Sequence, residues 1–138
     1  MKPIKIKEDV FWAGAMDWDR RLFDAIIPLP DGTSYNAYLI CGSEKTVLLD
    51  TVDPSMMHVL MSRLNDVKNI DFIISHHTEQ DHSGAIPHVL EKYKNAKVIA
   101  TAKARPMLVE HLHIPEDRII TVNDGETLSV GNKTLEFI

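Results

Sequence analysis

The sequence predicts a single α/β domain with a mixed sheet and helices on one face. Two observations favour this class. The first fifty residues hold several short runs of strand-forming residues separated by turn signals, which is typical of antiparallel strands. From about residue 54 onward, short apolar runs alternate with segments of helical periodicity. A chain of 138 residues is long enough for one domain at most.

Composition and charge exclude several classes of partner. The chain is 44% hydrophobic and 25% charged with a formal charge of -5, and its Lys and Arg residues are dispersed. We therefore expect neither a nucleic-acid partner nor a membrane surface. No apolar run has the length of a membrane span, and residues 1–7 alternate polar and apolar rather than forming a signal peptide. The single cysteine, Cys41, has no internal partner for a disulfide, which fits a reducing cytoplasm.

The N-terminal strands are predicted from short apolar runs. Residues 4–14 predict a first strand or hairpin, and residues 17–24 an irregular crossing into a strand through Ile26 and Ile27. Pro30, Asp31 and Gly32 form a strong turn signal. Two further strands are expected at 34–40 and 46–51, joined as a hairpin through 42–45.

The rest of the chain alternates helices and strands. A helix is expected from Pro54, since Met57, Leu60, Met61 and Leu64 lie on one helical face and Asp53 is a suitable N-cap. The run at 72–74 predicts a buried strand, followed by a loop and a helix that Gly84 opens. The remaining expected elements are a strand at 97–100, a helix at 106–111, and strands at 118–122, 127–130 and 134–138.

Potential metal ligands are concentrated between Ser75 and Gly84, where five of ten residues are His, Asp or Glu. In an extended stretch His77, Glu79 and Asp81 point the same way, and His82 joins them only through a local turn. Packed together without a cation, these donors would repel and desolvate one another. A metal pair explains the pattern, with His77 and Glu79 on one ion and Asp81 and His82 on the other. A solvated polar loop is the alternative.

This loop resembles the His-x-His-x-Asp-His signature of the metallo-β-lactamase superfamily. With Glu79 in place of the second His, the chain resembles the flavodiiron proteins (A-type flavoproteins) within it. The added carboxylate lowers the net charge of the site and suits iron. The resemblance covers essentially the whole chain through the matches Trp12-x-Gly14, Asp17-Trp18, Arg21, Phe23, Tyr35-Asn36-x-Tyr38-Leu39 and Leu49-Asp50-Thr51.

The resemblance implies a fold and a function. Residues 1–138 correspond to the N-terminal half of a metallo-β-lactamase-like αββα sandwich, so this partial diiron domain is expected to belong to a longer protein. The family completes its two-iron site with a later His, a bridging Asp and a final His, and adds a flavodoxin-like domain that binds FMN. None of these lies within the 138 residues. The implied parent enzyme is a cytoplasmic homodimer that reduces dioxygen to water, nitric oxide to nitrous oxide, or both, with electrons from a redox donor such as rubredoxin.

Three residues need separate interpretation. His76 stands where the family commonly carries Asn and is expected to lie at the surface or behind the ligands. Asp24 stands where many members place a His close to the irons. Asp50, at the end of its strand, is expected to orient the site loop, because ligating histidines need such partners.

Two other functions stay open: a zinc hydrolase of the lactamase or glyoxalase type, against which Glu79 argues, and a non-catalytic fragment. With four donors divided between two ions, the isolated chain is expected to bind metal weakly or not at all and to be inactive. Its sheet is also expected to lack the second sheet that covers one face in the family. We therefore expect the chain to associate through that face.

Overall fold

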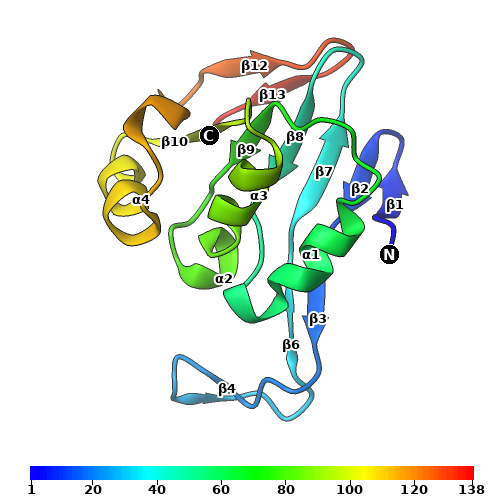
Figure 1. Cartoon of the computed structure of the whole chain (residues 1–138), viewed down its shortest axis with the longest axis vertical. Helices are drawn as coiled ribbons and strands as arrows, with labels where there is room; N and C mark the ends of the chain where they lie inside the picture. Colours follow the sequence, from blue (N-terminus) through cyan, green and yellow to red (C-terminus); the bar gives the residue numbers. More distant parts are fainter.

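The sheet at the centre of the molecule is mixed, as the sequence predicts (Figure 1). The computed structural model describes all residues from Met1 to Ile138. Neighbouring strands are antiparallel through the first half of the sheet and parallel through the second half. In sheet order the strands are β1 (Ile4–Lys7), β2 (Val10–Trp12), β7 (Tyr38–Cys41), β8 (Thr46–Leu49), β9 (Phe72–Ile74), β10 (Lys97–Thr101) and β11 (Ile119–Val122).

Helices cover one face of this sheet, and the main core lies beneath them (Figure 1). Leu48, Ile73 and Val98 are neighbours in register on three adjacent strands, and all three are buried in that core. The helices are α1 (Met57–Arg63), α2 (Gln80–Ser83), α3 (Ile86–Lys92) and α4 (Ala104–Leu112), with 3-10 turns at Pro54–Met56 and Glu116–Arg118. Asp53 caps the first of these turns through the Ser55 amide, as expected. No helix is long and apolar enough to cross a membrane.

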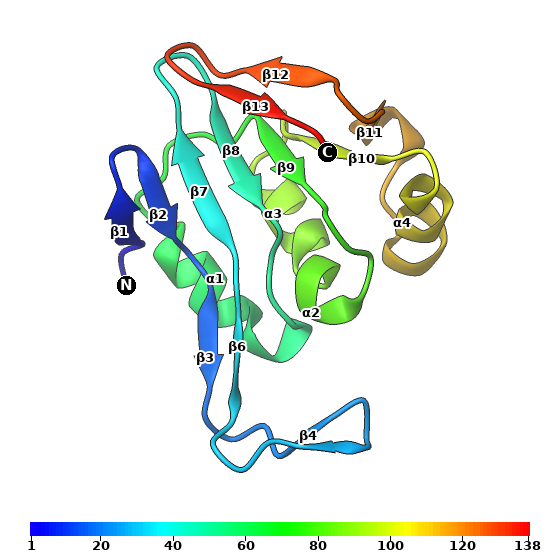
Figure 2. The same cartoon turned by 180° about the vertical axis from the view of Figure 1, so that it is seen from behind.

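The opposite face of the sheet is covered in part by a C-terminal hairpin, so the expectation that no second sheet covers this face is wrong for the area under the hairpin (Figure 2). The hairpin consists of β12 (Thr127–Ser129) and β13 (Thr134–Glu136). Val130 at its turn is buried in a second, smaller cluster with side chains of the sheet. Beside the hairpin an apolar cavity of about 510 Å³ remains over the strand ends, reaching from Leu49 to Ile138.

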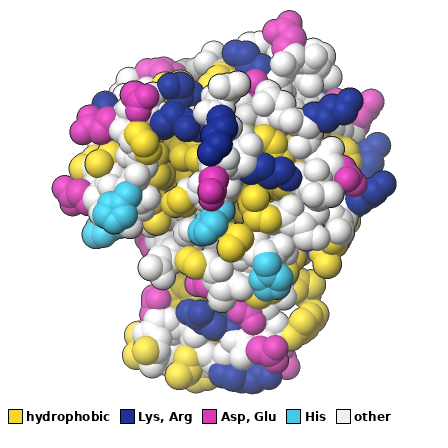
Figure 3. All heavy atoms as spheres, viewed as in Figure 1, with side chains coloured by type: hydrophobic (Ala, Val, Ile, Leu, Met, Phe, Trp, Pro, Cys, Tyr) yellow, Lys and Arg dark blue, Asp and Glu magenta, His cyan; other side chains and the backbone are white.

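An arm of residues 15–35 extends from the body of the molecule (Figures 1 and 3). Its base is the pair β3 (Ala15–Asp17) and β6 (Thr33–Tyr35), and its tip carries the pair β4 (Leu22–Phe23) and β5 (Ile27–Pro28).

The expected single strand at 34–40 is therefore wrong, because the chain breaks at Asn36 and Ala37 between β6 and β7. There the Trp12 indole donates a hydrogen bond of 3.0 Å to Asn36 Oδ1, and the Ala13 amide donates one of 2.8 Å to the Ala37 carbonyl.

Candidate metal centre

All four predicted ligands line one polar pocket of about 520 Å³ between the arm and the body. Its walls come from three parts of the chain: the arm tip, the residue that caps the 3-10 turn Pro54–Met56, and the segment that follows β9. Only one of its nine lining residues is hydrophobic. The lining residues are Arg20, Phe23, Asp24, Asp53, His77, Glu79, Gln80, Asp81 and His82.

The backbone of the site differs from the expected extended loop, because residues Gln80–Ser83 form the single helical turn α2. Glu79 keeps an extended conformation at the start of this turn and its carbonyl accepts the amides of His82 and Ser83. The Ser83 hydroxyl donates to the carbonyls of Thr78 and Glu79. The helical turn, rather than strand alternation, thus places Asp81 and His82 beside the extended segment of His77 and Glu79.

The four donors lie as two neighbouring pairs, and the assignment of one metal ion to each pair stays a prediction. His77 Nδ1 lies 3.7 Å from Glu79 Oε2, and His82 Nε2 lies 3.7 Å from Asp81 Oδ2. The rings of His77 and His82 are neighbours, with centroids 4.8 Å apart, so the pairs adjoin. No group of three or more His, Cys, Asp or Glu side chains is arranged to hold one metal ion. Each pair therefore offers two ligands to an ion and leaves the others to be supplied from outside this chain or by water.

Asp50 holds the second pair from behind. It directly follows β8 in a left-handed conformation with φ +53°, and its side chain is buried. Its Oδ1 accepts the His76 amide at 2.7 Å, and its Oδ2 lies 3.0 Å from His82 Nδ1. With Nδ1 engaged, His82 has only Nε2 for the pocket, which is the arrangement that metal-ligating histidines need. The orienting role expected of Asp50 matches these contacts.

The charge of Asp50 is set by the same neighbours. Burial acts to raise the pKa of Asp50, but hydrogen bonds from the His76 side chain and amide, with a further contribution from His82, outweigh it and hold the pKa below its usual value. The hydrogen bond to Asp50 in turn raises the pKa of His76, against the effect of burial. The His76 ring is half exposed and does not line the pocket of the four donors, which agrees with its expected place at the surface or behind them.

The donor set fits non-haem iron. Two imidazoles and two carboxylates face one pocket, and mixed sets of imidazole and carboxylate ligands are typical of non-haem iron sites. Asp24 also lines this pocket, in line with the position assigned to it from the sequence. Sequence reasoning missed Arg20 as a pocket residue, since no local pattern distinguishes it from the neighbouring Arg21. It assigned Asp53 to helix capping only.

The whole chain is similar to several known proteins. Residues 33–138 match the family model described as "ODP family beta lactamase". Over 98% of its length the chain is 39% identical to the anaerobic nitric oxide reductase flavorubredoxin of Vibrio vulnificus (strain YJ016), of which it covers 28%. Over 97% of its length it is 35% identical to the coenzyme F420H(2) oxidase of Methanothermobacter marburgensis, of which it covers 34%.

Solved structures show the same fold. The rubredoxin oxygen:oxidoreductase of the anaerobe Desulfovibrio gigas superposes with a TM-score of 0.88 at 34% identity, over 96% of this chain and 34% of that one. The expected lactamase-like α/β fold is thus confirmed. The chain spans about a third of the length of the relatives it matches.

Proposed function

The chain belongs to the ODP family of β-lactamase-like domains, the family of the flavodiiron proteins, and on this premise we propose that His77, Glu79, Asp81 and His82 hold part of a non-haem diiron site in a longer oxidoreductase. The observation that carries the proposal is the pairing of these side chains, one imidazole with one carboxylate in each pair, on a single pocket. The remaining ligands would come from residues outside this chain.

The proposed reaction is the reduction of dioxygen to water, of nitric oxide to nitrous oxide, or of both. Three similar proteins support it by name: a nitric oxide reductase, a coenzyme F420H(2) oxidase and an oxygen:oxidoreductase. When bound, the iron pair would supply the binding position for the diatomic molecule and the exchange of electrons with it. This chain supplies the geometry: His77 and Glu79 hold one metal position, Asp81 and His82 hold the other, and Asp50 keeps His82 in the orientation and tautomer that a ligand requires.

The cofactor and partners of the whole enzyme are part of the same proposal. We propose that FMN in a flavodoxin-like domain outside these 138 residues passes electrons to the irons. A redox protein such as rubredoxin would reduce the flavin, as the names flavorubredoxin and rubredoxin oxygen:oxidoreductase suggest for two similar proteins. The enzyme would act as a homodimer in the cytoplasm, where the single half-buried Cys41 stays reduced.

Elemental analysis tests the proposal most directly. The longer protein, purified without oxygen, is expected to contain iron and FMN and to consume dioxygen or nitric oxide with a reduced donor. Replacing His77 by Ala should remove iron and activity, whereas the matched variant His88→Ala, at an exposed position on α3, should change neither. Zinc without flavin would contradict the proposal and favour a hydrolase.

A further inference from the structure

We propose that Arg20 is a positioning residue that latches the arm tip, residues 18–29, across the metal pocket as a movable wall. Three of the nine pocket residues, Arg20, Phe23 and Asp24, come from this tip, and the others belong to the body. The tip's position therefore sets how open the pocket is. The presence of metal in this pocket rests on the proposed function. The attachment of the tip to the body rests on the contacts of Arg20 with Leu22 and Asp53.

The arm tip has few contacts of its own to hold it. None of its twelve residues is buried, and Trp18, Leu22, Ile26 and Ile27 are among the most exposed large apolar side chains of the chain. Its backbone hydrogen bonds either lie within the tip, as from Leu29 to Arg21 and from Ile26 to Phe23, or reach only the rest of the arm. The latter are the bonds from the Asp19 and Arg20 amides to Asp17 Oδ1 and from the Gly32 amide to the Leu29 carbonyl. A segment with exposed hydrogen bonds and no apolar core opens at low cost in free energy. Figure 3 shows it as a lobe below the body of the molecule.

Arg20 connects this segment to the body. Its Nε donates a hydrogen bond of 2.9 Å to the Leu22 carbonyl within the tip. Its Nη1 lies 3.8 Å from Asp53 Oδ2 on the body. Asp53 is itself fixed, because its Oδ1 accepts the Ser55 amide at 2.9 Å and the Ser55 hydroxyl at 2.6 Å. One guanidinium therefore donates a hydrogen bond within the tip through Nε and forms a longer ion pair with the fixed Asp53 carboxylate through Nη1.

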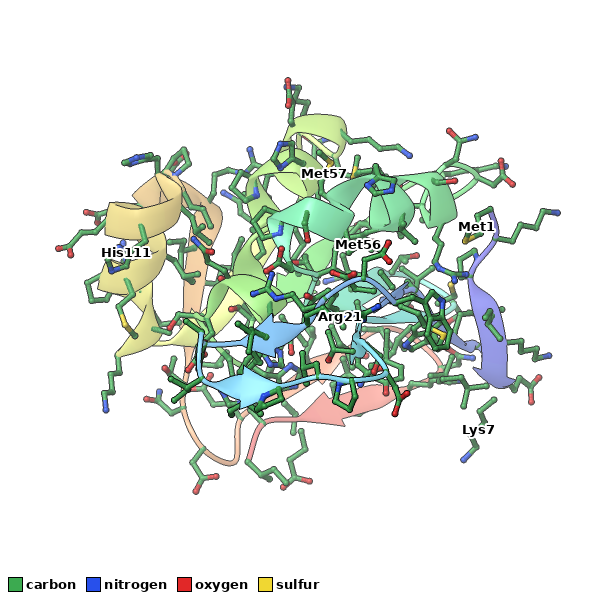
Figure 4. All side chains as sticks on the ribbon, turned by 90° about the horizontal axis from the view of Figure 1, so that it is seen from below. Met1, Lys7, Arg21, Met56, Met57 and His111 are labelled. Carbon is green, nitrogen blue, oxygen red and sulfur yellow. The ribbon has the colours of Figure 1, made fainter.

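The neighbouring Arg21 provides the contrast. It lies on the same tip, which is nearest the viewer in Figure 4. Its Nη1 donates to the Trp18 carbonyl, so its hydrogen bond stays within the tip. The two arginines share charge and segment but differ in whether they reach the body. Arg21→Gln is thus a matched control for Arg20→Gln.

A distance measurement between two spin labels tests the latch. The labels are placed on the full chain at Ile26→Cys on the tip and His88→Cys on α3, both exposed, in a background with Cys41→Ser. We expect Arg20→Gln to lengthen and broaden the distance distribution, because the tip loses its link to the body. Asp53→Asn should do the same while it keeps the cap, since Asn is an equally good N-cap. Arg21→Gln should leave the distribution unchanged.

Two further variants sharpen the test. The double variant Arg20→Gln with Asp53→Asn should show no more displacement than either single variant, because both break one contact. Arg20→Lys should restore part of the narrow distribution, because it keeps the charge but loses the hydrogen bond to Leu22. An unchanged distribution in both Arg20→Gln and Asp53→Asn, or an equal change in Arg21→Gln, overturns the latch. The distance measurement needs no metal, so a negative result for Arg20 and Asp53 would leave the diiron proposal unaffected. Conversely, zinc in the longer protein would contradict the diiron proposal but not the link between Arg20 and Asp53.

Discussion

His82 Nδ1 lies 3.0 Å from Asp50 Oδ2, although 32 residues separate them in the chain. The contact crosses from the end of β8 to the helical turn α2 and depends on the left-handed backbone of Asp50, which turns the carboxylate toward the site. A negative carboxylate at this position favours a proton on Nδ1, so that Nε2 keeps the lone pair that a metal needs.

Replacing Asp50 by Asn is therefore expected to weaken metal binding. Asn tolerates the left-handed backbone, but its amide group can donate to Nδ1 and shift the proton to Nε2. We expect the metal affinity of the longer protein to fall about 10- to 100-fold, as for other partners of ligating histidines. Iron or cobalt titration measures this, with Asp31→Asn on an exposed turn as the control. Equal affinity in both variants would show that Asp50 does not orient the ligand.

Glu79→His tests the choice of metal. An added imidazole in place of a carboxylate should lower iron retention and raise zinc retention, because it moves the ligand set toward zinc. Folding should change little, since the Glu79 side chain is mostly exposed at 68%. Metal content and melting temperature are measured together, with Glu91→His on the exposed face of α3 as the control. Undiminished iron would remove Glu79 from the ligand set.

The contacts of Asp9, at the end of the sheet away from the metal pocket, predict that the stability of the fold depends on pH. Its Oδ2 lies 2.7 Å from Lys133 Nζ and 3.3 Å from Asn132 Nδ2, which ties the turn after β1 to the C-terminal hairpin. The hydrogen bonds from Lys133 and Asn132 hold the pKa of Asp9 below its usual value. A carboxylate with a lowered folded pKa stabilises the fold above its unfolded pKa of about 4, and this contribution is lost as the pH falls through the folded pKa.

The variant Asp9→Asn should therefore melt below the wild type at neutral pH, and the difference should disappear in acid. Thermal unfolding from pH 7 to acid measures it, and Glu8→Gln provides a neighbouring control without such contacts. The difference is expected to be small, because Asp9 lies at the surface and salt screens it. A difference in melting temperature that grows in acid would contradict the stabilising role of the Asp9 carboxylate.

The apolar cavity beside the C-terminal hairpin predicts self-association of the isolated chain. Leu49, Val122 and Phe137 line it only half-buried, and Ile138 beside them is fully exposed. We expect sedimentation velocity to show association that increases with protein concentration. Val122→Lys should weaken it roughly ten-fold or more, since a charge in an apolar contact is costly. Ile26→Lys, at an exposed position on the arm, is the control. A monodisperse monomer at every concentration would contradict the prediction that copies of the chain associate through this cavity.

Much of the fold follows from local patterns. The sequence predicted the order and type of the main elements, the cap at Asp53 and the mixed sheet, all of which the structure contains. It also placed His77, Glu79, Asp81 and His82 directly after β9 and grouped them in two pairs. Periodicity, turn residues and capping act over a few neighbouring residues, so a single sequence records them.

Only the tertiary structure decided how distant segments meet. It broke the expected strand at Asn36 and Ala37 and made α2 a helical turn. It also brought Asp50 behind His82 and placed Arg20 in the same pocket as the four donors. The helical turn is held by local bonds to the Glu79 carbonyl, but the other three features depend on contacts between residues far apart in the chain. Such contacts leave no periodic signal in either partner. The sequence by itself thus determined which donors are present. Packing between distant segments determined which residue supports them, Asp50, and which residue shares their pocket, Arg20.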